Sequence, residues 1–161
     1  MYQLVTSQLK LHEKSYAVPY DTYIPDITNG MIEFMKENNA RGLAAPQIGI
    51  FMNIFVIRDM HDKYRVYVNP DITDIRKRGW FAEEEECISF PGERVIVARP
   101  GTIKILAMDE DWRHHKEKLI GIMARCVCHE MDHLRGRIVL DYRDTLFGMY
   151  GRHVEFFDLP R

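Results

Sequence analysis

Two patterns of hydrophobic and polar residues divide this chain into helical and extended stretches. In residues 25–39, Ile27, Met31, Ile32 and Met35 recur at helical spacing, which predicts an amphipathic helix. The middle of the chain instead carries short runs rich in β-branched and aromatic residues, which predict strands. We expect these strands at residues 53–57, 64–68, 72–76, 80–88, 93–98 and 102–108.

The connections between these stretches indicate how they pack. The polar residues 58–63 separate the first two predicted strands by a short turn, so these strands should form an antiparallel hairpin. A second helix is predicted over residues 117–134, with a stop at Gly136. The order of elements predicts an α+β fold, in which mostly antiparallel strands wrap around a buried helix.

Composition and charge fit a single intracellular domain and exclude several other classes. The 161 residues are 46% hydrophobic, enough to bury a core, so we expect one domain spanning residues 1–161. The net charge of −2 argues against a nucleic-acid-binding module, and no run approaches the roughly 20 apolar residues of a membrane span. Three cysteines do not make a disulfide framework, which indicates the reducing cytoplasm.

The end of the sequence predicts no long terminal helix. Only 20 residues follow Asp141, and Gly148, Gly151 and Pro160 interrupt them. We therefore expect the domain to lack a long C-terminal helix.

The segment His129-Glu130-Met131-Asp132-His133 carries the clearest chemical signal. Two histidines four residues apart lie on one face of a helix and can share one metal ion. A catalytic metal site needs a third protein ligand and an open position for water, so another ligand must come from a distant segment. Glu130 lies beside that open position, where it can accept a proton as a general base. Asp132 has two interpretations, either orienting an imidazole through its second ring nitrogen or simply solvating the helix.

Two further segments occur upstream of this helix. Residues 41–49 read RGLAAPQIG, and residues 85–89 read EECIS. Together with the helix, they resemble the three signature segments of the peptide deformylase family, which are a GxGLAAPQ loop, an EGCLS strand and a QHExDH helix. The resemblance runs from about residue 25 to about residue 140, and it is carried by three motifs in one order.

The resemblance implies a metal centre. Its ligands would be Cys87, His129 and His133, which combine a thiolate with two imidazoles. Such a donor set suits one divalent metal ion with water in the fourth position. The family resemblance favours Fe²⁺ in the cell, for which Zn²⁺, Ni²⁺ or Co²⁺ could substitute. A thiolate beside ferrous iron is open to oxidation, so we expect the iron form to be oxygen-sensitive.

The resemblance also implies a reaction, in which the N-terminal formyl group of formyl-methionyl peptides of nascent proteins is hydrolysed and formate is released. Glu130 would be the catalytic acid and base, and the Gln47 side chain and the Ile88 N–H would hold the oxyanion. The residues expected to bind the substrate are Gly42, Arg41, Glu86, Ile122, Arg125 and Cys126.

Two departures from the family pattern bear on specificity. Glu86 replaces a glycine next to the ligand cysteine, and Arg125 lies one helical turn before His129, where the family has apolar residues. Either the two charges form an ion pair at the pocket rim, or both point outward to solvent. They also motivate an alternative function, that of a metal-binding relative with lost or shifted substrate specificity. Glu85, in contrast, keeps the family pattern and is expected to form a salt bridge with Arg99.

The implied partners follow from the implied reaction. Nascent formyl-methionyl peptides would be the substrates, met in the cytoplasm of a bacterium or of a phage-infected host cell. Because a basic terminal helix is absent from the sequence, we expect at most a transient ribosome contact. We also expect a monomer that binds neither nucleic acid directly nor a membrane.

Overall fold

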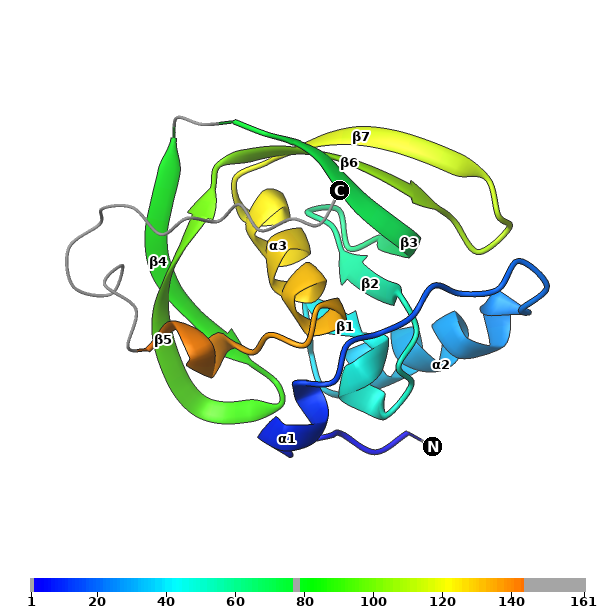
Figure 1. Ribbon diagram of the computed structural model, residues 1–161, viewed down its shortest axis with the longest axis horizontal. Coiled ribbons are helices and arrows are strands. Elements are labelled where there is room, and N and C mark those ends of the chain that lie inside the picture. The colour runs from blue at the N-terminus through cyan, green and yellow to red at the C-terminus, as the bar shows by residue number, and fades with distance from the viewer. Residues whose placement is uncertain (1, 77–78, 144–161) are drawn as a thin grey trace.

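Two antiparallel sheets and a central helix make up the computed structural model, which describes residues 2–76 and 79–143 (Figure 1). The larger sheet has the strand order β1-β2-β3-β6-β7, and the smaller sheet is the hairpin β4-β5. The strands are β1 (Gly42–Ala44), β2 (Ile54–Arg58), β3 (Tyr64–Ile75), β4 (Trp80–Cys87), β5 (Phe90–Pro100), β6 (Thr102–Met108) and β7 (His114–Ile120). The helices are α1 (Gln8–Leu11), α2 (Ile24–Glu37) and α3 (Ile122–Leu134), with 3₁₀ turns at Ala45–Ile48 and Val139–Tyr142.

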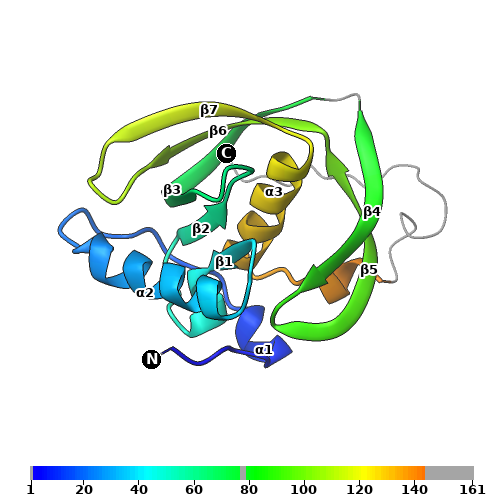
Figure 2. The same ribbon diagram turned by 180° about the vertical axis from the view of Figure 1, so that it is seen from behind.

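Helix α3 lies between the two sheets in both views (Figure 1, Figure 2). One side of α3 packs on the larger sheet, where Ala124, Val127 and Met131 share a core with Phe55 and Ile105. The hairpin β4-β5 packs its inner face on a second core together with the 3₁₀ turn that follows α3. The predicted α+β fold of mostly antiparallel strands around a central helix is therefore confirmed.

The first predicted helix is α2. Met31 and Met35 are fully buried, as the pattern predicted, whereas Ile27 and Ile32 flank the buried face. Thr28 takes a buried place on this face, and its hydroxyl donates to a main-chain carbonyl one turn back. Helices α2 and α3 cover opposite faces of the larger sheet, which explains why both faces of β2 are apolar.

The predicted hairpin consists of β2 and the first part of β3. The two strands pair from Ile54 with Val68 to Arg58 with Tyr64. The next predicted strand is not separate, because β3 continues past Val68 to Ile75 through a bulge. Asn69, with a φ of 47°, lies where the register with β6 shifts. A local kink that looks like a strand end in the sequence thus lies inside one long strand.

The predicted helix over residues 117–134 is wrong in its first part. His114–Ile120 form β7, which pairs with β6, and α3 begins only at Ile122. Gly121 separates the two elements with a φ of 60°, a left-handed conformation that favours glycine. β7 is an edge strand with charged residues, so its sequence resembles that of a solvated helix end.

The described chain ends shortly after α3, at the 3₁₀ turn Val139–Tyr142 beside β5. The expectation that the tail forms no long helix falls on residues 144–161 and lies outside the described residues. Within residues 2–76 and 79–143, no helix is long and apolar enough to cross a membrane.

Candidate metal centre

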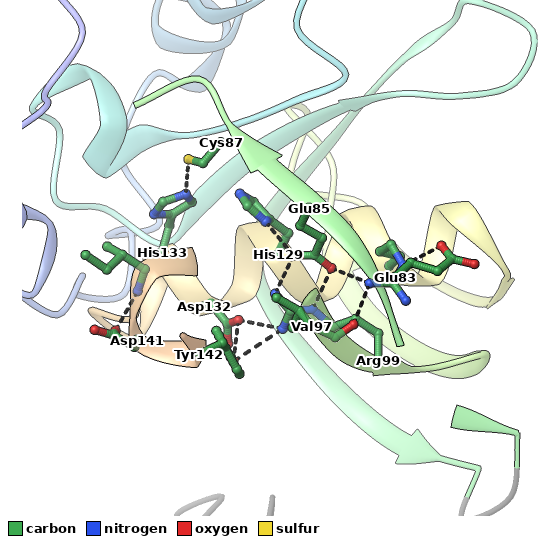
Figure 3. A network of polar contacts seen from close by, with 12 residues as sticks. Glu83, Glu85, Cys87, Val97, Arg99, His129, Asp132, His133, Asp141 and Tyr142 are labelled. Carbon is green, nitrogen blue, oxygen red and sulfur yellow. Dashed lines mark hydrogen bonds and ion pairs between the residues drawn. The ribbon is translucent and has the colours of Figure 1, made fainter. Parts of the chain in front are cut away.

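The three ligands predicted from the sequence converge where the hairpin meets α3. Cys87 is the last residue of β4, and His129 and His133 lie one helical turn apart on α3. Their ligand atoms all lie within 4.8 Å of one another, and Cys87 Sγ is 3.3 Å from His133 Nε2 (Figure 3). Metal–ligand bonds of about 2.0–2.3 Å at tetrahedral angles put ligand atoms about 3.5 Å apart. The spacing and the chemistry of the donors therefore fit a shared divalent ion.

His129 is oriented by a carboxylate behind it. Its Nδ1 lies 3.0 Å from Glu85 Oε2, and because a carboxylate only accepts hydrogen bonds, Nδ1 carries a proton. Burial lowers the pKa of His129, but contacts with Cys87 and Glu85 outweigh burial and raise this pKa well above its ordinary value. Nε2 is consequently the atom that takes up either a proton or a metal ion.

The Glu85 carboxylate accepts hydrogen bonds from several buried donors. Its oxygens accept from Nε and Nη2 of Arg99, each at 3.0 Å, which confirms the predicted Glu85–Arg99 salt bridge. Arg125 Nη1 adds a contact of 2.6 Å to Oε1. Burial alone would raise the pKa of Glu85, but His129 and Arg99 hold it well below its ordinary value. The carboxylate behind His129 is therefore ionised.

Asp132 has neither of the roles considered from the sequence. Its carboxylate is buried and contacts Arg99 Nη1 at 2.5 Å and the Tyr142 hydroxyl at 2.7 Å, rather than an imidazole or solvent. Arg99 thus connects Glu85 on β4 with Asp132 on α3 (Figure 3). Local spacing gave no signal of this contact, because 33 residues separate Arg99 from Asp132.

His133 is buried as a neutral imidazole. Its exposed fraction is 1%, and burial lowers its pKa well below the ordinary value. Nδ1 has no hydrogen-bond partner among the residues that the structure describes, whereas Nε2 faces Cys87. The neutral form is the one that binds metal ions, so the state of this ring suits the predicted ligand.

Glu130 projects from α3 toward β1. It is buried, and a Cβ added at Gly42 would lie 2.9 Å from its Cδ and closer still to its Oε1. Burial raises the pKa of Glu130 to about 7. Its Oε2 is buried with no hydrogen-bond partner within the described ranges. A carboxyl group with a pKa near neutrality can both accept and release a proton at physiological pH.

Gln47 lies in the 3₁₀ turn after β1, and its amide has a fixed orientation. Oε1 accepts from the Ala44 N–H at 2.9 Å, so the NH₂ group points the other way. Nε2 donates to Cys87 Sγ at 3.4 Å and to Ser89 Oγ at 3.2 Å. Ser89, to which the sequence assigned no role, therefore helps to aim the amide donors of Gln47 at the candidate metal centre.

A cavity of about 540 Å³ opens beside these groups. It is lined by all six residues that the sequence predicted for substrate binding, which are Gly42, Arg41, Glu86, Ile122, Arg125 and Cys126. The predicted catalytic residues Glu130, Gln47 and Ile88 line it as well. Lining residues that the sequence did not indicate are Asn38, Asn39 and Ala40 after α2, Glu84 on β4, and Pro91 and Gly92 in β5. They lie in the connection after α2 and on the β4-β5 hairpin, whose positions relative to α3 depend on the whole fold.

The predicted ion pair between Glu86 and Arg125 is wrong, and the alternative, that both point outward to solvent, holds for Glu86 but not for Arg125. Glu86 contacts Arg94 Nε at 2.5 Å on the exposed side of the hairpin, whereas Arg125 is buried and binds Glu85. Glu86 and Arg94 are register partners across β4 and β5, and the two-residue period of a strand turns Glu85 to the opposite face. Each charge has its own partner, so the two departures no longer support a lost or shifted activity.

Known proteins are similar to this chain in sequence and in fold. The family model for polypeptide deformylase matches residues 2–146. Peptide deformylase 1 of Clostridium perfringens is 41% identical over 117 residues, which make up 72% of this chain and 78% of that protein. A peptide deformylase of Prochlorococcus marinus is 42% identical over 125 residues, which make up 75% of this chain and 62% of that protein. The crystal structure of a probable peptide deformylase from Synechococcus phage S-SSM7 matches with a TM-score of 0.82 and 32% identity, over 88% of this chain and 99% of that chain. With its sequence, its fold and its Cys-His-His group in agreement, the chain belongs to the peptide deformylase family.

Proposed function

We propose that this protein is a metal-dependent hydrolase that removes the N-terminal formyl group from formyl-methionyl peptides of nascent proteins. The observation that carries the proposal is the placement of Glu130, whose buried carboxyl group has a pKa of about 7 and lines the same cavity as Cys87 and His129. Amide hydrolysis needs such a proton carrier next to an electrophilic centre. Membership of the peptide deformylase family supports the substrate class.

Cys87, His129 and His133 are the proposed ligands of one divalent metal ion. When bound, the ion would supply a Lewis acid that polarises the formyl carbonyl and lowers the pKa of water. One thiolate and two imidazoles suit ferrous iron, which we propose for the cell, and they also accept Zn²⁺, Ni²⁺ or Co²⁺. Glu85 holds the His129 ring through Nδ1, an arrangement that fixes the tautomer of a metal-binding histidine.

Glu130 is proposed to move the protons of the reaction. It takes a proton from the attacking water, whose oxygen bonds to the formyl carbon. It then gives the proton to the amide nitrogen as the carbon–nitrogen bond breaks, which leaves formate and a peptide with a free amino terminus. The raised pKa of Glu130 suits both transfers near neutral pH. Gly42 makes room for the carboxyl group because it has no side chain.

Negative charge that develops on the formyl oxygen is proposed to be stabilised by Gln47 and Ile88. The amide donors of Gln47 already point toward Cys87, held by Ala44 and Ser89. Ile88 lies in the turn directly after Cys87, so its main-chain N–H is the second proposed donor. One Gln47 donor would exchange its contact with Cys87 or Ser89 for the oxyanion, while the Ala44 N–H keeps the amide oriented, so little reorganisation is needed when the charge appears.

The methionyl side chain is proposed to occupy the cavity beside Glu130. Ile122 and Cys126 on α3 supply apolar wall, and burial raises the pKa of Cys126 to about 12, so this thiol stays neutral. Arg41 and Gly42 line the cavity from the β1 side, and Glu86 lies at its edge on the hairpin. A polarizable thioether packs well against such a mixed surface.

The experiment that tests the function measures formate release from a formyl-Met-Ala-Ser peptide by anaerobically purified, iron-loaded protein. Rapid release is expected, with no reaction on the acetylated peptide. Glu130→Gln should lower kcat by about 10²–10⁴-fold while the metal content stays unchanged. A folded, metal-loaded sample that releases no formate would overturn the proposal.

We also propose that the enzyme acts as a monomer in the cytoplasm of a bacterium or of a phage-infected host cell. All three cysteines are free thiols, which suits a reducing compartment. The net charge of −2 provides little attraction to ribosomal RNA or to anionic lipid, so any ribosome contact is transient. Co-sedimentation with ribosomes at physiological salt, or a dimer mass in analytical ultracentrifugation, would contradict this assignment.

A further inference from the structure

The three candidate ligands come from two separate elements of the fold. Cys87 ends the two-stranded hairpin β4-β5, whereas His129 and His133 lie on α3. The spacing between the thiol and the imidazoles therefore depends on how the hairpin docks on the helix. Two buried arginines cross this junction, Arg99 from β5 and Arg125 from α3.

Arg125 makes four polar contacts across the junction, and all of them go to the hairpin. Nη1 donates to Glu85 Oε1 at 2.6 Å and to the Val97 carbonyl at 2.9 Å. Nη2 donates to the Phe81 carbonyl at 2.6 Å, and Nε lies 3.1 Å from Glu83 Oε2. Three of these partners are on β4 and one is on β5, so a single guanidinium connects α3 to both strands. The planar fork of donors in arginine is suited to this, and a lysine ammonium is not.

The buried charges at the junction balance only when Arg125 is included. Arg99 and Arg125 carry two positive charges, and their buried partners Glu85 and Asp132 carry two negative charges. Without Arg125, one negative charge would remain uncompensated directly behind His129, which Glu85 contacts at 3.0 Å. An uncompensated buried charge is costly, so the surrounding groups rearrange or admit water.

Substrate binding does not explain the guanidinium of Arg125. Each of its three nitrogens already has an acceptor on the hairpin, and the side chain is 8% exposed. A buried group whose donors are engaged has little hydrogen-bonding capacity left for a ligand. Its contacts instead go to the hairpin that carries Cys87.

We propose that Arg125 is a positioning residue of the metal centre, which fixes the docking of the β4-β5 hairpin on α3 and with it the spacing between Cys87 Sγ and the imidazoles of His129 and His133. The inference rests on the proposed function only in that these three residues hold a metal ion.

The test compares wild type, Arg125→Met, Arg125→Lys and the control Arg94→Met, all loaded with Co²⁺. Arg94 lies on the same hairpin, but its ion pairs go to the exposed Glu84 and Glu86 and do not reach α3. Metal affinity is measured by competition with a chelator. The visible and near-ultraviolet spectra report the thiolate-to-cobalt bond and the coordination number, and thermal unfolding reports the fold.

Arg125→Met should bind Co²⁺ about 10–100-fold more weakly, with a weaker thiolate band, because the hairpin no longer holds the thiol at its proper distance. Arg125→Lys should be intermediate, and Arg94→Met should match wild type in affinity and spectrum.

A folded Arg125→Met protein with wild-type affinity and spectrum would overturn the proposal, as would an equal loss in Arg94→Met. If Arg125→Met does not fold, Arg125→Lys decides, because one ammonium cannot serve four acceptors and wild-type behaviour would again overturn it. Failure of the proposed function is a separate result, namely a wild-type protein that binds Co²⁺ normally and releases no formate.

Discussion

Replacing Gly42 by alanine should disable Glu130 without touching a metal ligand. The added Cβ would lie 2.9 Å from Cδ and 3.2 Å from Cγ of Glu130, whereas nonbonded carbon atoms are about 3.5–4.0 Å apart at their optimum. The strand cannot yield, because Gly42 pairs with Ile57 in β2. The carboxyl group therefore has to retreat by roughly 1 Å, and a displacement of that size costs about 100-fold in rate.

The assay is steady-state formate release from a formyl-methionyl peptide, with the metal content of each sample measured in parallel. We expect Gly42→Ala to lose about 100-fold in kcat, with unchanged metal content and a nearly unchanged KM. Gly30→Ala is the control, because the three atoms nearest to its Cβ would all belong to the ring of Tyr2, the closest at 2.5 Å, in a side chain near the N-terminus. A wild-type kcat would refute the reasoning, and a rise in KM alone would show that Gly42 contacts the substrate instead.

Four further predictions concern the surroundings of the metal centre. Glu85→Gln should lower the free energy of unfolding in urea by about 3–5 kcal/mol, because two buried arginines lose their shared carboxylate, whereas the exposed Glu84→Gln should not. The pKa of Glu130 rises from 4.5 to about 7 on folding, so the metal-free folded state keeps a proton that the unfolded state releases. The free energy of unfolding should therefore fall by about 3 kcal/mol as the pH rises from 4.5 to 7, and Glu130→Gln should remove this slope in urea titrations. Gln47→Ala should lower kcat by about 10²–10³-fold with little change in KM. A KM that changes by as large a factor as kcat would reject the role of Gln47 at the oxyanion. The iron-loaded enzyme should lose activity and release metal on aeration, and mass spectrometry should find oxidised Cys87; full activity after prolonged aeration would contradict this.

Much of the fold and site could be predicted because the relevant signals are local. The spacing of His129 and His133 depends only on the geometry of a helix, and the face of α2 on its own period. The Glu85–Arg99 salt bridge followed from the family resemblance, and the structure confirms it. The catalytic roles assigned to Glu130 and the other cavity residues remain predictions.

The contacts that sequence reasoning missed are those between distant segments. Arg125 and Glu85 are 40 residues apart, and their contact depends on the register of β4 with β5, which decides the face that each side chain occupies. The same holds for Asp132, which the helix places but whose arginine partner comes from a strand. The prediction of the boundary between β7 and α3 was wrong for another reason, because charged edge strands and solvated helix ends have similar composition.

The order of the ligands along the chain has a consequence for how the enzyme matures. Cys87 and His133 are 46 residues apart in sequence, although they are 3.3 Å apart in space. A ribosome releases the thiol first and α3 only later, so a growing chain that ends before α3 presents Cys87 with neither imidazole beside it. Insertion of the proposed metal ion therefore has to wait until translation has passed His133. An enzyme proposed to trim the nascent chains of other proteins accordingly cannot trim its own before its third proposed ligand, His133, has been synthesised.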